Sequence, residues 1–280
     1  MSRFALWVVL LALTAPLGGA ACAAARSGPP PARKGASVAT ETVPVDASEP
    51  SAASKVPSWT LVAFGDSWPY GAHCHGCKPF PRLYADGLAA TTAHHIEFVN
   101  LTTNGGTSQS LLASIQSSPD TRRAVASADI IVISTGMNDL EPAGKLYVDG
   151  RCGGVDQLDC LREAANAWRV SFAGMLTEIN ALRRGHSTAI RLVSNSNEFL
   201  SDPELIQIFG SSFGLGPGAA ITDMHHDILN EVAAGHGAIC VDLRPVLNGA
   251  SHQTARDVNS QEAMQAVADA LLASGHRELR

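Results

Sequence analysis

The chain has 280 residues, of which 45% are hydrophobic and 16% charged, which is enough for one sizeable core plus extensions. The formal net charge is −6 at pH 7, and no Lys/Arg cluster is present, so no nucleic-acid partner is expected. The absence of triplet repeats, long heptads and multiple apolar 20-residue runs from the sequence excludes collagen, a coiled coil and a polytopic membrane protein.

Residues 1–22 predict a secretory signal peptide. Arg3 precedes an apolar run, 4–17, that is too short to span a bilayer comfortably, and small residues lead from it to Cys22. Cys22 is also similar to the lipidated cysteine of bacterial lipoproteins, although Gly19 stands where that pattern favours Leu. Ordinary cleavage and lipidation both stay open. We therefore expect an exported protein, either secreted or tethered to the membrane as a lipoprotein on the cell exterior.

Residues 23–58 predict a disordered linker. They are mainly Ala, Pro, Ser and Thr, and the run Pro29-Pro30-Pro31 breaks any helix. Such a stretch cannot bury enough apolar area to offset its ordering entropy. The predicted folded domain is therefore 59–280.

Alternating strands and helices predict a three-layer α/β/α sandwich with about five parallel strands. Most of the β-type runs are continuously apolar, which suits strands covered on both faces. Apolar side chains at three- and four-residue spacing predict a helix at 161–184, and Asn259 with Glu262 predicts the capped start of a last helix. Ligands of such folds bind beyond the carboxyl ends of the strands. The predicted strands are 60–64, 96–101, 130–134, 190–194 and 238–243.

A polar turn follows each of the first three predicted strands. The turns contain Gly65-Asp66-Ser67, then the segment 100–108 with its Asn-Leu-x-x-x-Gly pattern ending at Gly105, then Gly136-Met137-Asn138-Asp139. Each alone is an ordinary strand-to-helix turn. Three in this order, each after its own strand, are a more specific signal.

The three turns together suit acyl transfer. Ser67, exposed at the start of a helix, can act as a nucleophile. Its attack on an ester carbonyl creates an oxyanion, which needs donors that are fixed in advance. The backbone N–H groups of Ser67 and Gly105 and the side-chain amide of Asn138 are the expected donors.

These blocks resemble the first three sequence blocks of the SGNH (GDSL) hydrolases, in element order from about Trp59 to the C-terminus. The resemblance implies a flavodoxin-like fold and hydrolysis of a carboxylic ester, either a lipid or an acylated carbohydrate. It implies Ser67 as nucleophile and oxyanion donor, with Gly105 and Asn138 completing the oxyanion hole. We expect a monomer with no cofactor and no metal.

The fourth block of that family, Asp-x-x-His before the last helix, is missing. Alignment puts Ala255 and Val258 at these two positions, and neither can transfer a proton. In one explanation, which we favour, His252 is the base and Asp257 orients it. In another, the domain has lost efficient hydrolysis and binds an acylated or carbohydrate ligand. In a third, a different histidine serves: His73, His75, His225 or His226.

The cysteines suit an exported protein, in which disulfides form. Local pairs Cys74–Cys77 and Cys152–Cys160 are expected, and similar segments occur in exported bacterial members of the family, although spacing alone does not prove them. If Cys22 is lipidated or removed, these pairs leave Cys240 as a free thiol in a buried strand. A zinc site at the His-Cys-His-Gly-Cys segment 73–77 is less favoured than a disulfide.

Other polar residues are interpreted as structural. Asp139 is expected to brace its turn. We interpret Glu198 with Asp202 as a solvated face, and His225-His226 as surface residues.

Overall fold

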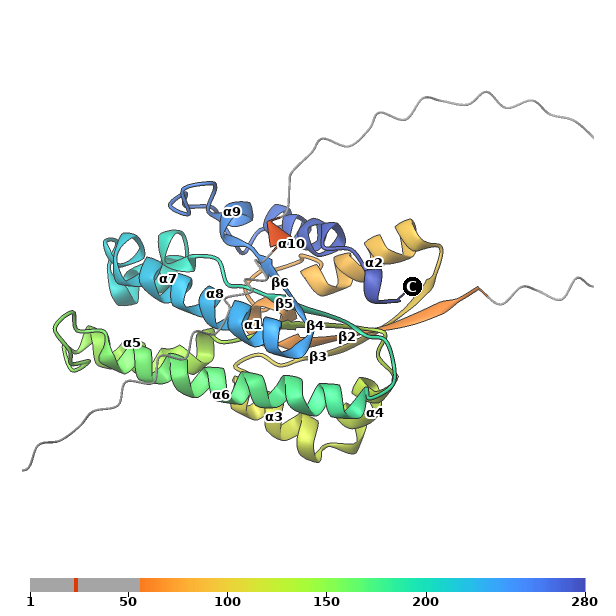
Figure 1. The fold of residues 1–280 in the computed structure, drawn as a ribbon. Coiled ribbons are helices and arrows are strands. Elements are labelled where there is room, and N and C mark those ends of the chain that lie inside the picture. Colours follow the sequence, from red (N-terminus) through yellow and green to blue (C-terminus); the bar gives the residue numbers. More distant parts are fainter. Residues whose placement is uncertain (1–22, 25–55, 280) are drawn as a thin grey trace, which may run out of the picture.

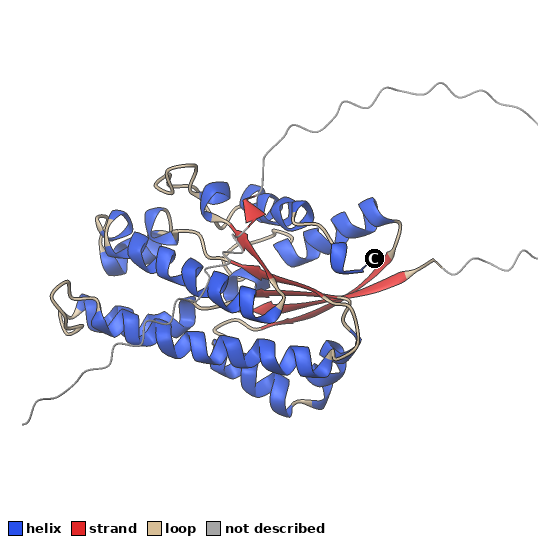
Figure 2. Ribbon diagram, viewed as in Figure 1, coloured by secondary structure: helices blue, strands red, loops and turns tan. Residues whose placement is uncertain are grey.

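The computed structural model describes residues 23–24 and 56–279, which form a parallel sheet between two layers of helices (Figure 1 and Figure 2). The strand order is β1-β6-β5-β4-β2-β3, and every pairing is parallel. Apart from the two-residue β1, this is the 2-1-3-4-5 order of flavodoxin-like folds. The predicted α/β/α fold class is confirmed. The strands are β1 Ala23–Ala24, β2 Ser58–Gly65, β3 His95–Thr102, β4 Ile130–Ser134, β5 Ala189–Val193 and β6 Ile239–Asp242.

The central strands are buried along their whole length. Every residue of β4 and β5 is buried, as expected for continuous apolar runs covered on both faces. At the sheet edge, Ala23 and Ala24 pair with Val241 and Asp242, although they belong to the predicted linker. The predicted signal peptide, including Cys22, and the rest of the linker up to residue 55 lie outside the described residues.

Helices cover each face of the sheet with its own hydrophobic cluster. One cluster joins the sheet to α3, α4, α5, α6 and α8, and the other joins it to α2, α9 and α10. No helix among the described residues is long and apolar enough to cross a membrane. The helices are α1 Ser67–Tyr70, α2 Phe80–Thr92, α3 Ser108–Ser117, α4 Pro119–Ser127, α5 Met137–Val148, α6 Asp159–Leu182, α7 Pro203–Phe209, α8 Pro217–His236, α9 Arg244–Leu247 and α10 Gln261–Ala273, with 3-10 turns η1 Glu198–Leu200, η2 Phe213–Leu215 and η3 Arg277–Leu279.

The last helix begins one residue later than expected. The N-cap of α10 is Ser260, whose hydroxyl accepts a hydrogen bond from Ala263 N at 3.1 Å. The side chain of Asn259 instead donates to Asp202 Oδ2 at 3.1 Å. A tertiary hydrogen bond therefore decides between two adjacent residues that can both cap a helix.

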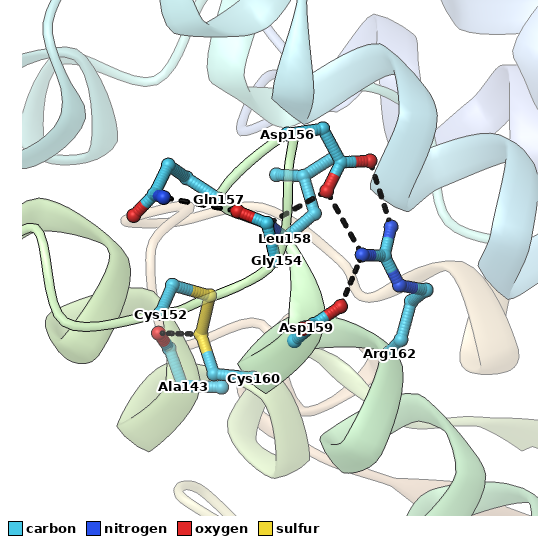
Figure 3. Close-up of a disulfide and its surroundings, with 9 residues drawn as sticks. All are labelled: Ala143, Cys152, Gly154, Asp156, Gln157, Leu158, Asp159, Cys160 and Arg162. Atoms are coloured by element: carbon cyan, nitrogen blue, oxygen red, sulfur yellow. Dashed lines mark hydrogen bonds and ion pairs between the residues drawn. A yellow bond between two sulfur atoms is a disulfide. The ribbon is translucent and has the colours of Figure 1, made fainter.

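Both predicted local disulfides are present. Cys74–Cys77 follows α1, and Cys152–Cys160 closes the connection between α5 and α6. In Figure 3, the Arg162 guanidinium beside the second bridge contacts Asp156 at 2.8 and 2.9 Å and also bonds Asp159.

The expectation of a free thiol at Cys240 is wrong. Cys240 is disulfide-bonded, and its sulfur is buried in β6 beside the other apolar side chains of the sheet. The expectation assumed that Cys22 is lipidated or removed, which leaves an odd number of cysteines once the two local pairs are made.

Candidate active site

The first turn joins the ends of three strands. Asp66 N donates to Ser134 O at 3.2 Å, and Thr103 N donates to Gly65 O at 2.9 Å. A Cβ at position 65 would lie 2.3 Å from Ser134 O, so only glycine allows this approach between β2 and β4. The turn therefore delivers Ser67 directly above the sheet, as the first residue of α1.

Asp66 caps the helix that carries Ser67. Its carboxylate accepts from Trp68 N at 3.3 Å. Burial, together with the charge of the nearby Asp139, raises the pKa of Asp66 to about 7. The hydroxyl of Ser67 has no hydrogen-bond partner among the residues the structure describes, and the side chain is partly exposed. A serine in this position is open to a ligand.

The second turn exposes the main chain at Gly105, with no side chain in front of it. Gly105 has a φ of +75°, a left-handed conformation that favours glycine, and a Cβ built there would meet no atom within 4 Å. Gly106 N closes the turn on Thr103 O at 2.8 Å. The main chain at Gly105 is thus both held in place and accessible.

The third turn is fastened to the second by two side chains. Asn138 Nδ2 donates to Gly106 O at 2.9 Å, which uses one of its two amide hydrogens. Asp139 accepts from Ser108 N at 3.0 Å and from Ser108 Oγ at 2.5 Å, so it braces the turn as expected. Burial raises the pKa of Asp139, although its hydrogen bonds from Ser108 act in the opposite direction.

Ser67, Gly105 and Asn138 line one pocket of about 330 Å³. The three turns that the sequence analysis singled out therefore meet at one place. The opposite wall is mostly apolar and comes from α5, η1 and α7. It includes Leu140, Phe199, Leu205, Ile208 and Phe209. The pocket combines convergent polar groups with an apolar surface, as is usual for a small-molecule site.

The structure does not bring His252 into this pocket. His252 lies in the loop after α9 with a left-handed φ of 57°, and its N donates to Gly249 O at 3.0 Å. It is not among the residues that line the pocket, whereas the exposed His73 is. Val258 is 1% exposed, and its carbonyl oxygen accepts from Trp68 Nε1 at 3.1 Å.

The interpretation of His225 and His226 as surface residues is wrong, because both lie on the buried face of α8. His225 stacks on Trp168 with ring centroids 4.3 Å apart, and its Nε2 lies 3.2 Å from Thr135 O. Burial lowers its pKa to about 4. Neither residue lines the pocket with Ser67.

Sequence reasoning missed Glu198. The expected solvated face is wrong here, because Glu198 begins η1 and lines the pocket. Burial raises its pKa to about 8, with further contributions from the charges of Asp66 and Asp202. Asp202 accepts from Glu204 N and Leu205 N and so caps α7. The signal was available, since Glu198 follows the fourth predicted strand at the edge where the other turns lie.

A comparison with known protein families matches most of the folded domain. The sequence model of the GDSL-like lipase/acylhydrolase family matches residues 63–262. No protein among those with curated functions matches the chain.

Solved structures share the fold at low sequence identity. The lipase Lip_vut3 from a goat rumen metagenome is 19% identical, with a TM-score of 0.64, over 79% of this chain and 100% of that one. The extracellular lipase of Streptomyces rimosus is 15% identical, with a TM-score of 0.54, over 78% and 100%. A variant of Axe2, an acetyl-xylooligosaccharide esterase from Geobacillus, is 17% identical, with a TM-score of 0.52, over 80% and 96%.

Proposed function

The chain belongs to the GDSL-like lipase/acylhydrolase family, and we propose that it is a serine esterase that hydrolyses a carboxylic ester through an acyl-enzyme on Ser67. The observation that carries this proposal is the meeting of Ser67, Gly105 and Asn138 in one pocket. There the Ser67 hydroxyl, the Gly105 backbone amide and the Asn138 carboxamide can all contact the same carbonyl group of a substrate.

The proposed reaction has two halves. Ser67 Oγ attacks the ester carbon, and the carbonyl oxygen becomes an oxyanion that accepts hydrogen bonds from the N–H groups of Ser67 and Gly105 and from the second amide hydrogen of Asn138. The alcohol then leaves, and water hydrolyses the acyl-serine. The bond from Asn138 to Gly106 O fixes the amide before the substrate arrives, so little reorganisation is needed.

The lining of the pocket supports an acyl group of modest size. Leu140, Phe199 and Leu205 offer apolar contacts, while Glu198 and Asp202 add polar ones. Structures with this fold include lipases and an acetyl-xylooligosaccharide esterase. We therefore propose a lipid ester or an acylated carbohydrate as the substrate class, with no cofactor or metal, and a monomeric enzyme.

Export belongs to the same proposal. It rests on the signal-like segment 1–22, and the two local disulfides agree with an oxidising compartment. Lipidation at Cys22 is the less favoured variant, because Cys240 is disulfide-bonded and Cys22 is the one other cysteine of the sequence outside the two local pairs. Fractionating cells that express the full chain and its Cys22→Ala variant tests it. Membrane-bound wild type and released variant support a lipoprotein. Equal release of both supports secretion, and a cytoplasmic location for both contradicts export.

A catalytically impaired binding protein is the second candidate. Val258 occupies the position at which the family resemblance expects the base histidine, and this observation favours a weakened enzyme. On this alternative, an acylated or carbohydrate ligand would occupy the same pocket without turnover.

Hydrolysis of p-nitrophenyl acetate and butyrate separates the two. The esterase proposal predicts saturable turnover that Ser67→Ala abolishes. Ser67→Ala is a mild change to the fold, because the hydroxyl has no partner among the described residues. Turnover that is equal in wild type and Ser67→Ala contradicts the proposal, and ester binding without turnover supports the impaired protein.

A further inference from the structure

We propose that Glu198 is the general base that removes the proton from Ser67, in the place of the histidine that this chain lacks. The inference rests on the proposed esterase function and names the group that this function requires. Its first support is position, since Glu198 and Ser67 line the same pocket.

The carboxylate of Glu198 is unpartnered among the described residues, and the residue is partly buried in the pocket wall. No hydrogen bond or ion pair to its side-chain oxygens occurs among the described residues. Its neighbours Asn197 and Phe199 are buried at 2% and 5% exposure, and both anchor η1. Asn197 Nδ2 donates to Gly214 O at 2.7 Å, and its N donates to Asn248 Oδ1 at 2.7 Å. The anchored turn η1 therefore places the carboxylate of Glu198 at the pocket, where it has no partner among the described residues.

Contacts tie this segment to the vacant base position. Trp68, which follows the nucleophile, donates from its indole to Val258 O. The next residue, Asn259, donates to Asp202 Oδ2, four residues beyond Glu198. These two hydrogen bonds connect Trp68, through Val258 and Asn259, to Asp202, which lies two residues beyond η1. Glu198 is therefore close in sequence to a residue that contacts the neighbour of the position where the family resemblance expects a histidine.

The electrostatic setting makes Glu198 a stronger base than an ordinary carboxylate. Burial is the main reason that its pKa rises to about 8, and the charges of Asp66 and Asp202 add to the effect. A base whose pKa lies near the working pH combines adequate ionisation with proton affinity. The other charged or titratable side chains that line the pocket are His73, Glu141, Lys145 and Glu204, and Glu141 is paired with Lys145 at 2.8 Å.

The proton balance closes without any other reactant. The Glu198 carboxylate takes the Ser67 hydroxyl proton while the Oγ–C bond forms and the carbonyl electron pair moves to oxygen. The neutral acid returns this proton to the leaving alkoxide as the C–O bond breaks. The carboxylate then takes a proton from water, which attacks the acyl carbon, and returns it to Ser67 Oγ.

His73 is the competing base. It also lines the pocket, but it is exposed, and no hydrogen bond orients its ring among the residues described. Base histidines of serine hydrolases are held by a third group. Glu198 is less exposed than His73 and lies on an anchored 3-10 turn, so it is the better candidate.

The test measures kcat and KM for p-nitrophenyl acetate between pH 5 and 9.5 with the full chain. The variants are Glu198→Gln, Glu198→Ala, His73→Ala and Ser67→Ala, and Glu163→Gln on the exposed face of α6 is the matched control. We expect Glu198→Gln to lower kcat by about 10²–10⁴-fold and to remove the rise in rate between pH 6 and 8. We expect Glu163→Gln to keep both.

Two readouts, the pH profile and rescue by formate, separate catalysis from a structural role. Formate should restore part of the activity of Glu198→Ala, because a small carboxylate can enter the vacated space. Loss of activity with an unchanged pH profile and no formate rescue overturns the proposal.

The outcomes also distinguish this inference from the proposed function. Full activity in Glu198→Gln, with none in Ser67→Ala, overturns the base and leaves the esterase. Loss in His73→Ala alone assigns the base to His73. Wild-type activity in Ser67→Ala overturns the esterase and, with it, the base.

Discussion

Trp68 Nε1 donates to the carbonyl oxygen of Val258 at 3.1 Å, which joins the residue after the proposed nucleophile to the position where the family resemblance expects a histidine. Both residues are buried, at 6% and 1% exposure. The backbone of Val258 therefore contacts Trp68, which lines the pocket, while the Val258 side chain packs into the core.

We expect Trp68→Phe to destabilise the fold. The change leaves Val258 O buried without its donor, which costs about 1–3 kcal/mol, and the phenyl ring can still pack against Phe80. Urea unfolding measures the loss. Trp168→Phe is the matched control, because its buried indole N–H has no hydrogen-bond partner among the described residues. Equal destabilisation by both changes would show that lost ring volume, not the hydrogen bond, is responsible.

We expect Asn138→Ala to lower kcat. Removing one oxyanion donor typically lowers kcat about 10²–10³-fold, while KM should change little because the donor acts mainly in the transition state. Steady-state kinetics on p-nitrophenyl butyrate measure this. Ser108→Ala is the control for the turn, since it removes the hydroxyl that bonds Asp139 and keeps the amide. A comparable loss of kcat in Ser108→Ala would show that the effect comes from disturbing the turn and not from losing an oxyanion donor.

The pH dependence of stability should report on Asp66. Its pKa is raised from 3.8 to about 7 in the folded chain. The folded state therefore holds this proton more tightly than the unfolded state, and stability falls as pH rises from about 4 to 7. Asp66→Asn removes this penalty, on the order of a few kcal/mol, and asparagine can still cap α1.

Urea unfolding of wild type and Asp66→Asn at pH 4 and pH 8 checks the sign. The free energy of unfolding of Asp66→Asn, minus that of wild type, should be larger at pH 8 than at pH 4. A free-energy difference that is the same at both pH values would contradict the raised pKa. The same variant should also move the acid limb of activity to lower pH, because the Asp66 charge helps to raise the pKa of Glu198.

The sequence predicted what local patterns determine. Continuous apolar runs placed β4 and β5, and turn chemistry placed Ser67, Gly105 and Asn138 beyond the strand ends, where the structure brings them into one pocket. These features follow from a few neighbouring residues and the rule that parallel strands end at one edge.

The remaining features depend on contacts between distant segments. Ser260 rather than Asn259 caps α10 because Asn259 bonds Asp202. His225 is buried because α8 packs its imidazole against Trp168. Glu198 lies in the pocket because η1 is anchored through Asn197. No local pattern distinguishes such a polar side chain from a solvated one.

Removal of the Cys152–Cys160 bridge should lower stability. A disulfide that closes a loop of this length contributes roughly 2–3 kcal/mol in the chain-entropy account. We expect Cys152→Ser/Cys160→Ser to melt at a lower temperature than wild type without reductant. With reductant, wild type should lose stability and the variant should lose less. A variant that melts with wild type under non-reducing conditions would show that the bridge adds nothing to stability.

The most direct test of the account is covalent labelling of the full chain with a p-nitrophenyl phosphonate ester, followed by intact-mass and peptide-mass analysis. An acyl-transfer nucleophile at Ser67 predicts one adduct per chain, on the peptide that contains Ser67, with one equivalent of p-nitrophenolate released. An unlabelled chain, or an adduct on any other residue, would contradict it.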